Sequence, residues 1–311
     1  MKVVLSRKGF DGKNGGFASP LLDGLMISLP VPVTYRQEDH RIHYADLRYG
    51  NNAKVIDLLR KMLKTKIKVA KGKKSKWRNA KELSAHLDPD LCRESYPRER
   101  GWRGLFGING DCQKEIEENG GLRKDDLFLF FGWFKKFERD KTNQLVNAED
   151  ENYYPSGRHV IFGYLQIDKI LPLSYMEPTN ARIKKWMNYH PHIGKEGKIV
   201  GNDDFFENNT LYVARRKLTF AKKPGFGVFH HDPGSEVVLT LTKKGCTRSK
   251  WHLPRAFTTP KQVEITRNPH GWDTWDGGKG YFQSADIGQE FMIEECTEIN
   301  KWARSLIRDF G

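Results

Sequence analysis

Residues 126–134, with the sequence DLFLFFGWF, form the most apolar stretch of the chain. A short run that is apolar at consecutive positions and rich in aromatic side chains predicts a central strand buried on both faces. Residues 159–170 predict a second strand of this kind. We expect the two strands to pair as neighbours, with the polar residues 141–155 as their connection. Other extended segments are expected at residues 1–5, 25–32, 210–213 and 236–242.

The helices predicted from periodicity are few and peripheral. We expect an amphipathic helix in the first half of residues 53–82, short helices at 112–118 and 181–189, and a terminal amphipathic helix from Met292 to Phe310. Because strands outnumber helices and do not alternate regularly with them, the sequence predicts an α+β fold. The expected architecture is a mixed, largely antiparallel sheet or partial barrel with peripheral helices. We expect a single domain over residues 1–311 that includes a basic helix/loop insert at residues 53–82.

Composition narrows the class of protein further. The chain has 311 residues, of which 12% are aromatic, a share too high for a disordered chain. No apolar run approaches the roughly 20 residues of a membrane-spanning helix, so no membrane association is expected. The four cysteines lie far apart without a CxxC motif. This spacing argues against a disulfide framework or a four-cysteine zinc site and favours a reducing, cytoplasmic location.

The positive charge is concentrated in one segment. Residues 53–81 carry twelve basic residues against the single acid Asp57, and they account for +11 of the net charge of +14. Such a concentration predicts salt-dependent binding to a polyanion, and we expect a nucleic acid, DNA rather than RNA. The alternatives are a solvated helix face with a flexible loop, or an anionic membrane or other partner. The residues expected to contact nucleic acid are Lys64, Lys66, Lys68, Lys71, Lys73, Lys74, Lys76, Arg78 and, by stacking on an unpaired base, Trp77.

A glycine-rich loop follows the first predicted strand. Its Gly15-Gly16 turn can expose backbone N–H groups, and an arginine such as Arg7 can hold a phosphate through two hydrogen bonds. The loop contains neither the GxxxxGK[ST] nor the GxGxxG phosphate-binding pattern. We therefore expect either a site for a phosphate-bearing ligand or a structural network of turns around glycines with positive φ. The candidate ligand-binding residues here are Arg7, Asp11, Gly15, Gly16, Ser19 and Asp23.

The segment His86-Leu-Asp88-Pro-Asp90 places one imidazole and two carboxylates at alternate positions. In an extended segment these side chains share a face, where they can act as acid–base groups or ligate a divalent metal. The alternative is a helix stop in which the two aspartates are capping residues. The pair His190 and His192 is a second candidate for ligand or metal binding, although unrelated loops often contain such pairs.

A third group of candidates lies towards the C-terminus. Trp251 follows the basic residue Arg248, and the two side chains can enclose a base. Gln289 and Glu290 can read a base edge or polarise a hydroxyl. Alternatively, Trp251 is a core residue and Glu290 lies in the first turn of the last helix, where the helix dipole favours it. The chain lacks the GxSxG, HExxH and HxE…PCxxC motifs, which disfavours serine hydrolases, zincins and zinc deaminases.

Several motifs occur in one order along the chain: SRKGFDGKNGGFASPLLDG, MISLPVP, HLDPDL, KDDLFLFFGWFK, HVIFGYLQI, HPH, NTLYVAR, RSKWHLP and GQEF. Together, from Ser6 to Phe291, they resemble the third nucleotide-modification-associated domain family. That family is named for its association with genes that modify DNA bases, so the resemblance implies a field of activity and no particular reaction. Its polar motif residues correspond here to Arg7, Asp11, Ser19, Asp23, Ser28, His86, Asp88, Asp90, Trp133, His190, His192, Trp251, Gln289 and Glu290.

The chain departs from the family pattern in three places. Asp125-Asp126 replaces the usual Gly-Asp before the apolar strand, residues 107–111 replace a glutamine-rich stretch, and the basic segment is long and highly charged. If residues 107–111 touch the ligand, the choice of substrate differs in this chain.

The leading hypothesis is an enzyme that modifies bases in nucleic acid by group transfer or hypermodification. The expected catalytic residues are His86, Asp88, Asp90 and Glu290, and the expected ligand-binding residues outside the glycine-rich loop are Trp133, His190, His192, Trp251 and Gln289. A divalent metal and a nucleotide-type donor are the cofactors considered, with the metal ligands left open and no obligate protein partner inferred. One alternative is a PUA/EVE-like module in which Trp133, Trp251 and Tyr212 cage a modified base. A further alternative is a metal-dependent nuclease against modified DNA.

Overall fold

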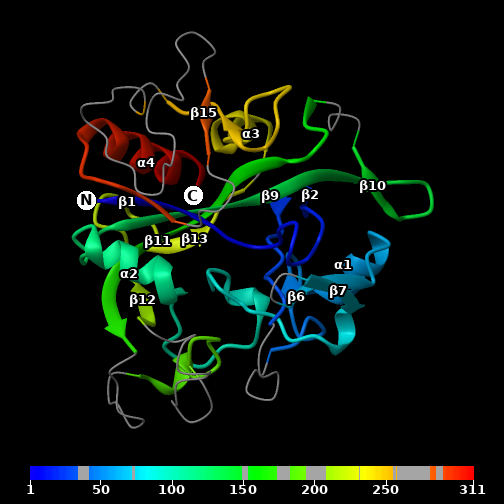
Figure 1. Cartoon of the computed structure of the whole chain (residues 1–311), viewed down its shortest axis with the longest axis horizontal. Helices are drawn as coiled ribbons and strands as arrows, with labels where there is room; N and C mark the ends of the chain where they lie inside the picture. The colour runs from blue at the N-terminus through cyan, green and yellow to red at the C-terminus, as the bar shows by residue number, and fades with distance from the viewer. Residues whose placement is uncertain are drawn as a thin grey trace.

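The computed structural model describes residues 1–33, 42–71, 74–148, 153–173, 183–193, 208–230, 232–254, 257, 281–284 and 290–311. Within these ranges the chain forms a ten-stranded mixed sheet with few helices (Figure 1). The sheet contains β1 (Val3–Arg7), β2 (Ser19–Leu22), β3 (Leu25–Met26), β8 (Leu105–Ile108), β9 (Leu127–Arg139), β10 (Leu145–Asn147), β11 (Arg158–Pro172), β12 (Thr210–Ala214), β13 (Phe226–Val228) and β16 (Glu290–Ile293).

The strands follow the order β16-β1-β9-β11-β12-β8. β1 is parallel to β9, and the other neighbours on this path are antiparallel. The central strand β9 is fully buried from Leu127 to Phe131. Strands at the two most apolar stretches, their pairing as neighbours and the α+β class are therefore confirmed.

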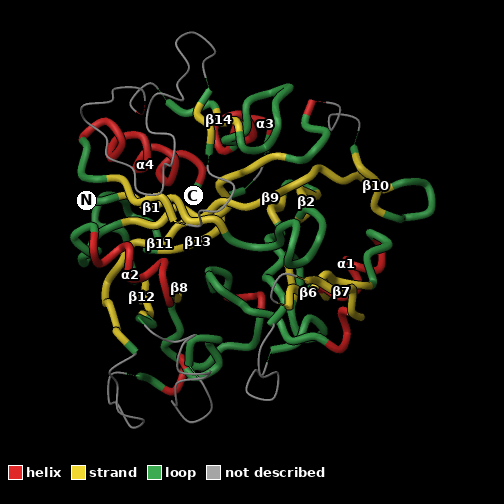
Figure 2. The backbone as a smooth tube through the Cα atoms, viewed as in Figure 1, coloured by secondary structure: helices red, strands yellow, loops and turns green. Residues whose placement is uncertain are grey.

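The sheet is strongly curled and remains open. The ring of Phe106 on β8 lies 4.8 Å from Phe128 and 4.9 Å from Phe130 on β9, measured between ring centroids, although β11 and β12 lie between these strands in the sheet order. The sheet must therefore curve until its two sides approach each other, and Figure 2 shows β12 and β8 bent below the central strands. In the described ranges β16 and β8 do not pair, so the barrel is partial.

Four helices lie at the periphery of the described structure: α1 (Val55–Lys61), α2 (Gly110–Glu118), α3 (Pro233–Leu239) and α4 (Thr297–Phe310). α4 lies beside β1 and α3 (Figure 1), and it buries Ile299, Ala303 and Leu306. The expected terminal helix is thus confirmed with a later start. Residues 290–293 form β16 instead, because they pair with β1. None of the described helices combines the length and apolarity needed to cross a bilayer.

The strand expected at residues 236–242 is wrong, because residues 233–239 form α3. Asp232 precedes this helix and accepts a hydrogen bond from the Ser235 N–H at 2.7 Å, while the Ser235 hydroxyl accepts one from the Asp232 N–H at 2.9 Å. This reciprocal capping starts a helix with Pro233 in its first turn. The helix expected at residues 181–189 lies partly outside the described residues, and its described part contains a single 3₁₀ turn, Lys185–Met187.

The basic insert contains a helix and a hairpin. α1 confirms the helix expected in its first half, but the second half, expected to be a loop, forms the antiparallel strands β6 (Lys66–Lys71) and β7 (Lys74–Asn79). Ile67 and Val69 alternate with lysines along β6 and are buried at 0% and 8% exposure. They pack with α1 and the N-terminal loop into a second apolar cluster, separate from that of the large sheet. We call β6 and β7 the basic hairpin. Two further strand pairs are β4 (Arg48–Tyr49) with β5 (Ala53–Lys54) and β14 (Lys250–Trp251) with β15 (Phe282–Gln283).

Candidate functional site

Asp88 lies at the centre of a buried group of histidines. Its Oδ1 is 3.2 Å from Nε2 of His190, and its Oδ2 is 3.9 Å from Nε2 of His192. Oδ1 also accepts a hydrogen bond of 2.9 Å from the Gly107 N–H, at the start of the segment that departs from the family pattern. The ring of the half-buried His86 packs edge-on against His192, with the ring centroids 5.4 Å apart. The structure thus brings together four of the predicted site residues, which we call the Asp88 cluster: His86, Asp88, His190 and His192.

The hydrogen bonds around the two buried imidazoles define their tautomers. His190 Nδ1 accepts from the His192 N–H at 3.3 Å, so the ring proton of neutral His190 lies on Nε2, which faces Asp88. This Nε2 makes no aligned hydrogen bond in the described residues, so its contact with Asp88 is electrostatic. His192 Nδ1 lies 2.7 Å from Oδ1 of Asn209 and therefore carries the proton of that ring. The Nε2 lone pair of neutral His192 is consequently available to accept a proton.

The electrostatics keep Asp88 ionised and His192 neutral. Burial alone would raise the pKa of the Asp88 carboxyl, but the close contact with His190, followed by the charges of His192 and His86, lowers this pKa to about 2. Burial, which the Asp88 carboxylate only partly offsets, lowers the pKa of His192 to about 4. At neutral pH the pair is therefore a carboxylate beside an uncharged imidazole.

Asp90 belongs to a different network from Asp88. Its carboxylate accepts hydrogen bonds from Arg98, from Tyr189 and, at 2.9 Å, from the indole N–H of Trp102. The Arg98 guanidinium lies between the aromatic rings of Tyr96, Trp102 and Tyr189. Asp90 is fully buried, and burial raises its pKa despite the positive charge of Arg98. Through these hydrogen bonds Asp90 holds the segment that carries Asp88 in place. A catalytic role for Asp90 stays a prediction.

A largely buried lysine connects the Asp88 cluster to Glu290. Ser6 on β1 and Lys8, just after the end of this strand, contact the same carboxylate: Lys8 Nζ lies 2.8 Å and Ser6 Oγ 3.2 Å from Oε1 of Glu290 on β16. Burial disfavours the charge on Lys8, yet the carboxylates of Glu290 and Asp88 outweigh burial and raise its pKa. Lys8 was not among the site residues predicted from the sequence. The alternation of side chains along an extended segment could have identified it, because Lys8 lies on the same face as Ser6 and Arg7 lies on the other. The alternative that placed Glu290 in the first turn of the last helix is wrong, since Glu290 begins β16.

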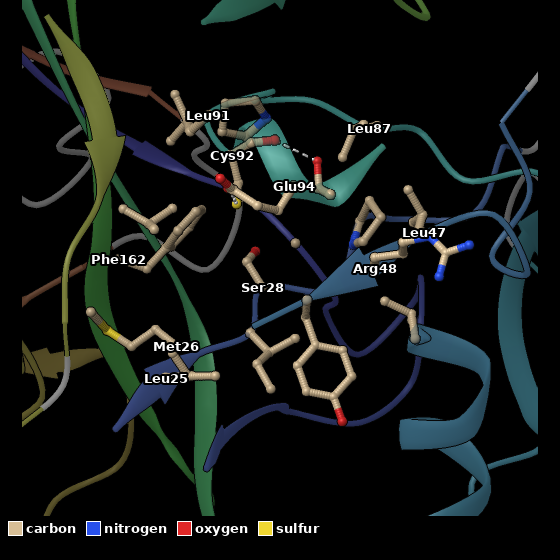
Figure 3. Close-up of a pocket in the computed structure, with 18 of the residues that line it drawn as sticks. Leu25, Met26, Ser28, Leu47, Arg48, Leu87, Leu91, Cys92, Glu94 and Phe162 are labelled. Atoms are coloured by element: carbon tan, nitrogen blue, oxygen red, sulfur yellow. Dashed lines mark hydrogen bonds between the residues drawn. The ribbon is translucent and has the colours of Figure 1, made fainter. Parts of the chain in front are cut away.

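A cavity of about 380 Å³ reaches Asp88 from the surface. Its buried end is formed by Leu87, Asp88, Leu91 and Phe162, and the last of these is the extra residue of a β-bulge in β11. The outer end includes the exposed residues Gly50, Glu94, Val228 and His230. In Figure 3 the Ser28 hydroxyl lies between Met26 and the segment that carries Cys92 and Glu94. Size, an apolar wall and a few polar groups are the usual properties of a ligand pocket.

The glycine-rich loop is engaged within the protein. The Gly15 N–H donates to the Lys68 carbonyl at 2.8 Å, and the Gly16 N–H to the Asp11 carbonyl at 2.9 Å. The Asp11 carboxylate accepts from two N–H groups of its own turn, and Ser19 Oγ accepts from the Leu29 N–H. Asp23 pairs with Arg139 on the surface, and Arg7 lies close enough to His159 to lower the pKa of that buried imidazole further, after burial itself. A phosphate bound here would have to replace the hydrogen bonds that the Gly15 and Gly16 N–H groups make to backbone carbonyls. Phosphate binding by this loop therefore stays a prediction.

The two candidate tryptophans lie in different surroundings. Trp251 is 1% exposed, packs against Phe131 and Phe291, and donates its indole N–H to His159. Trp133 is half-buried, and the Arg248 guanidinium lies over its ring, with Cζ of Arg248 4.2 Å from the centroid of the Trp133 ring. Tyr212 is also 1% exposed. Trp251 and Tyr212 are therefore core residues, and the expected cage of Trp133, Trp251 and Tyr212 does not open to a ligand.

The basic hairpin presents its outer strand to solvent. All six residues of β7 are exposed, including Lys74, Lys76, Arg78 and Trp77, whose exposure is 53%. Lys66 is exposed at the start of β6, Lys68 donates to the Gly12 carbonyl, and Lys64 lies over the ring of Phe17. The backbone of Lys71 belongs to β6. Lys73 and Gln289 lie outside the described residues.

The arrangement of the donor side chains bears on metal binding by the predicted ligands. In the part of the chain that the structure describes, no three or more His, Cys, Asp and Glu side chains are arranged to hold a metal ion. The Asp88 cluster is therefore described by its acid–base chemistry, and a metal role for its residues stays a prediction.

The curled mixed sheet with its peripheral helices defines an α+β protein, and the cavity lined by Asp88 is its candidate binding site. The chain belongs to the family of nucleotide modification associated domain 3, whose model matches residues 2–294. This match confirms the resemblance given by the ordered motifs. No curated protein and no solved structure matches the chain. The family relates the protein to nucleotide modification.

Proposed function

We propose that this protein is an enzyme that modifies a base of a nucleic acid, DNA in the first instance, by transferring a group from a nucleotide-type donor. The observation that carries the proposal is a cavity that Asp88 lines, with the neutral imidazole of His192 behind it, 3.9 Å from Oδ2 of Asp88. A base in this cavity would meet a carboxylate that can orient it. The family membership supports a nucleotide as the material acted on.

The proposed chemistry follows from the protonation states in the Asp88 cluster. As an atom of the base forms its bond to the transferred group, it loses a proton, and the leaving group of the donor departs with the electron pair of the broken bond. Nε2 of His192 would receive that proton, since its lone pair is available and Asp88 stabilises the resulting imidazolium. The half-buried His86, in contact with His192, would return the proton to solvent.

The basic hairpin supports nucleic acid as the form in which the base is presented. Val55, the first residue of α1, lines the cavity, and the same insert carries the exposed cations of β7. Phosphates held on β7 would therefore be bound by the same insert that supplies Val55 to the cavity wall.

Nucleoside mass spectrometry tests the proposed reaction. The protein is incubated with plain and hydroxymethylated-base DNA, Mg²⁺ and Mn²⁺, and a pool of donors that includes NAD and nucleotide sugars. We expect a nucleoside of new mass from the native protein and its loss with Asp88→Asn. Asp111→Asn, which removes an exposed carboxylate at α2, is the matched control and should retain the product.

Equal turnover by Asp88→Asn would remove Asp88 from the reaction. Shortened DNA with unmodified nucleosides would instead assign a nuclease, and tight binding of modified DNA without any product would assign a base-reading module.

A further inference from the structure

The cavity is apolar along its walls and offers acceptors where it is polar at its buried end. Asp88 is the ionised group there, and its carboxylate has lone pairs beyond the one that accepts from the Gly107 N–H. At the outer end, Glu94 is a second carboxylate and accepts from the Cys92 thiol at 3.2 Å. The Arg48 guanidinium turns away from the cavity in Figure 3 and donates to the Asn52 carbonyl at 3.4 Å. A ligand that fits these groups is apolar or aromatic in its body and presents hydrogen-bond donors to Asp88.

The dimensions restrict how a base could reach Asp88. Asp88 lines a cavity of about 380 Å³ together with Leu87, Leu91 and Phe162, and its side chain is only 3% exposed. The cations of β7, in contrast, lie on an exposed strand. A stacked duplex cannot enter such a space, so a base must enter alone, either unstacked from its strand or as a free nucleotide.

We propose that the cavity selects a single nucleobase that presents an exocyclic amino group to Asp88, adenine or cytosine, and rejects the matching keto bases. The N4 amino group of cytosine and the N6 amino group of adenine are donors, whereas uracil and hypoxanthine place an oxygen at the same position. A keto oxygen at this position would face a carboxylate oxygen with no hydrogen between the two acceptors, which penalises the wrong base more strongly than the mere absence of a hydrogen bond would. This inference rests on the proposed function for the class of ligand and adds the identity of the base.

Binding of matched oligonucleotides tests this selection without requiring turnover. Single strands identical except for one central nucleotide are compared by fluorescence anisotropy, deoxycytidine against deoxyuridine and deoxyadenosine against deoxyinosine. We expect the amino-bearing strand of each pair to bind about tenfold more tightly. The corresponding mononucleotides form a second arm: binding of these with the same preference assigns the site to free nucleotides, and binding of the strands alone assigns it to bases in a chain.

Three variants locate the preference. Val228→Trp, at a residue 37% exposed in the mouth, should abolish the preference, and Val146→Trp, at a residue 40% exposed on β10, should retain it. Asp88→Asn, whose amide can donate or accept, should reduce the preference to near unity. This variant tests the inference independently if circular dichroism shows that Val228→Trp does not fold.

Equal affinities within both pairs would overturn the inference, as would a preference that survives in Asp88→Asn. A preference without any modified product would overturn the proposed function alone. A product formed equally on amino and keto bases would overturn the inference alone.

Discussion

His192 occupies a space that exists because residue 107 has no side chain. A Cβ atom at Gly107 would lie 2.4 Å from Cγ and Cδ2 of the imidazole. Gly107→Ala should therefore displace His192 from Asp88, lower the free energy of unfolding by about 1–3 kcal/mol and abolish turnover. Urea denaturation and nucleoside mass spectrometry measure the two effects. Gly12→Ala is the control, since nothing lies within 4 Å of a Cβ there, and equal behaviour of the two variants would contradict this packing.

The buried imidazole of His192 also makes stability depend on pH. Its pKa is about 4 in the folded protein against an ordinary value of 6.5, so the unfolded chain binds more protons between these limits. Stability is then fully present above about pH 6.5 and falls by up to about 3 kcal/mol as the pH drops towards 4. The lowered pKa of His159 acts in the same direction, and Asp88 adds a loss from about pH 4 towards 2.

Urea unfolding across this window checks the contribution of His192. His192→Gln should make the decline between pH 6.5 and 4 shallower than in the native protein. If the two declines are parallel, His192 is not the group that titrates.

The residues of the Asp88 cluster were all among the candidates identified from the sequence, but their arrangement in space was not predicted. His86, Asp88 and Asp90 were expected to converge on one face of an extended segment. The Asp88 N–H instead donates to the His86 carbonyl at 2.8 Å, a tight turn that sends the two carboxylates into different networks. The partners of Asp88 at residues 190 and 192 come from about a hundred residues away, and no local pattern encodes that interaction.

Among the elements, the basic hairpin is the one whose role is easiest to isolate. Replacement of four exposed cations by glutamine should make the plot of log affinity for DNA against log salt concentration less steep. The magnitude of its negative slope should fall by about 0.9 for each phosphate that the hairpin no longer neutralises. The positions are Lys66, Lys74, Lys76 and Arg78. Anisotropy titrations over a range of salt concentrations measure the slope.

The control removes the same charge elsewhere, at the exposed Lys114, Lys124, Lys141 and Lys301. It should leave the slope nearly unchanged. Equal slopes for the two fourfold variants would show that the hairpin does not form the DNA-binding surface.

Element prediction succeeded where burial alone determines the structure, as in β9 and β11. It failed where a few side chains decide between structures. Ile67 and Val69 make a strand of a lysine-rich stretch by packing on the second apolar cluster. The Asp232–Ser235 capping pair makes a helix of a stretch whose β-branched residues suggest a strand.

Two of the three apolar clusters formed by the described residues share one long strand. β9 lies in the cluster of the large sheet up to Phe134, and its later residue Phe137 packs against the cluster that contains α1 and β6. We therefore predict a single cooperative unit. Hydrogen exchange should give the most protected amides of α1, β6 and β9 the same free energy of opening. Opening of α1 and β6 at a much lower free energy than β9 would indicate two domains.

The cavity and the Asp88 cluster differ in what supports them. The cluster rests on the Asp90–Arg98 anchor and the interior of the curled sheet, whereas short surface segments such as β3, β4 and the end of β13 supply the walls of the cavity. Substitutions at Leu25, Arg48 or Val228 would reshape the walls of the cavity while Asp88 and His192 keep their relative positions. Substitutions in these wall segments should therefore change which sizes and shapes of ligand the cavity accepts, while the Asp88 cluster keeps its geometry.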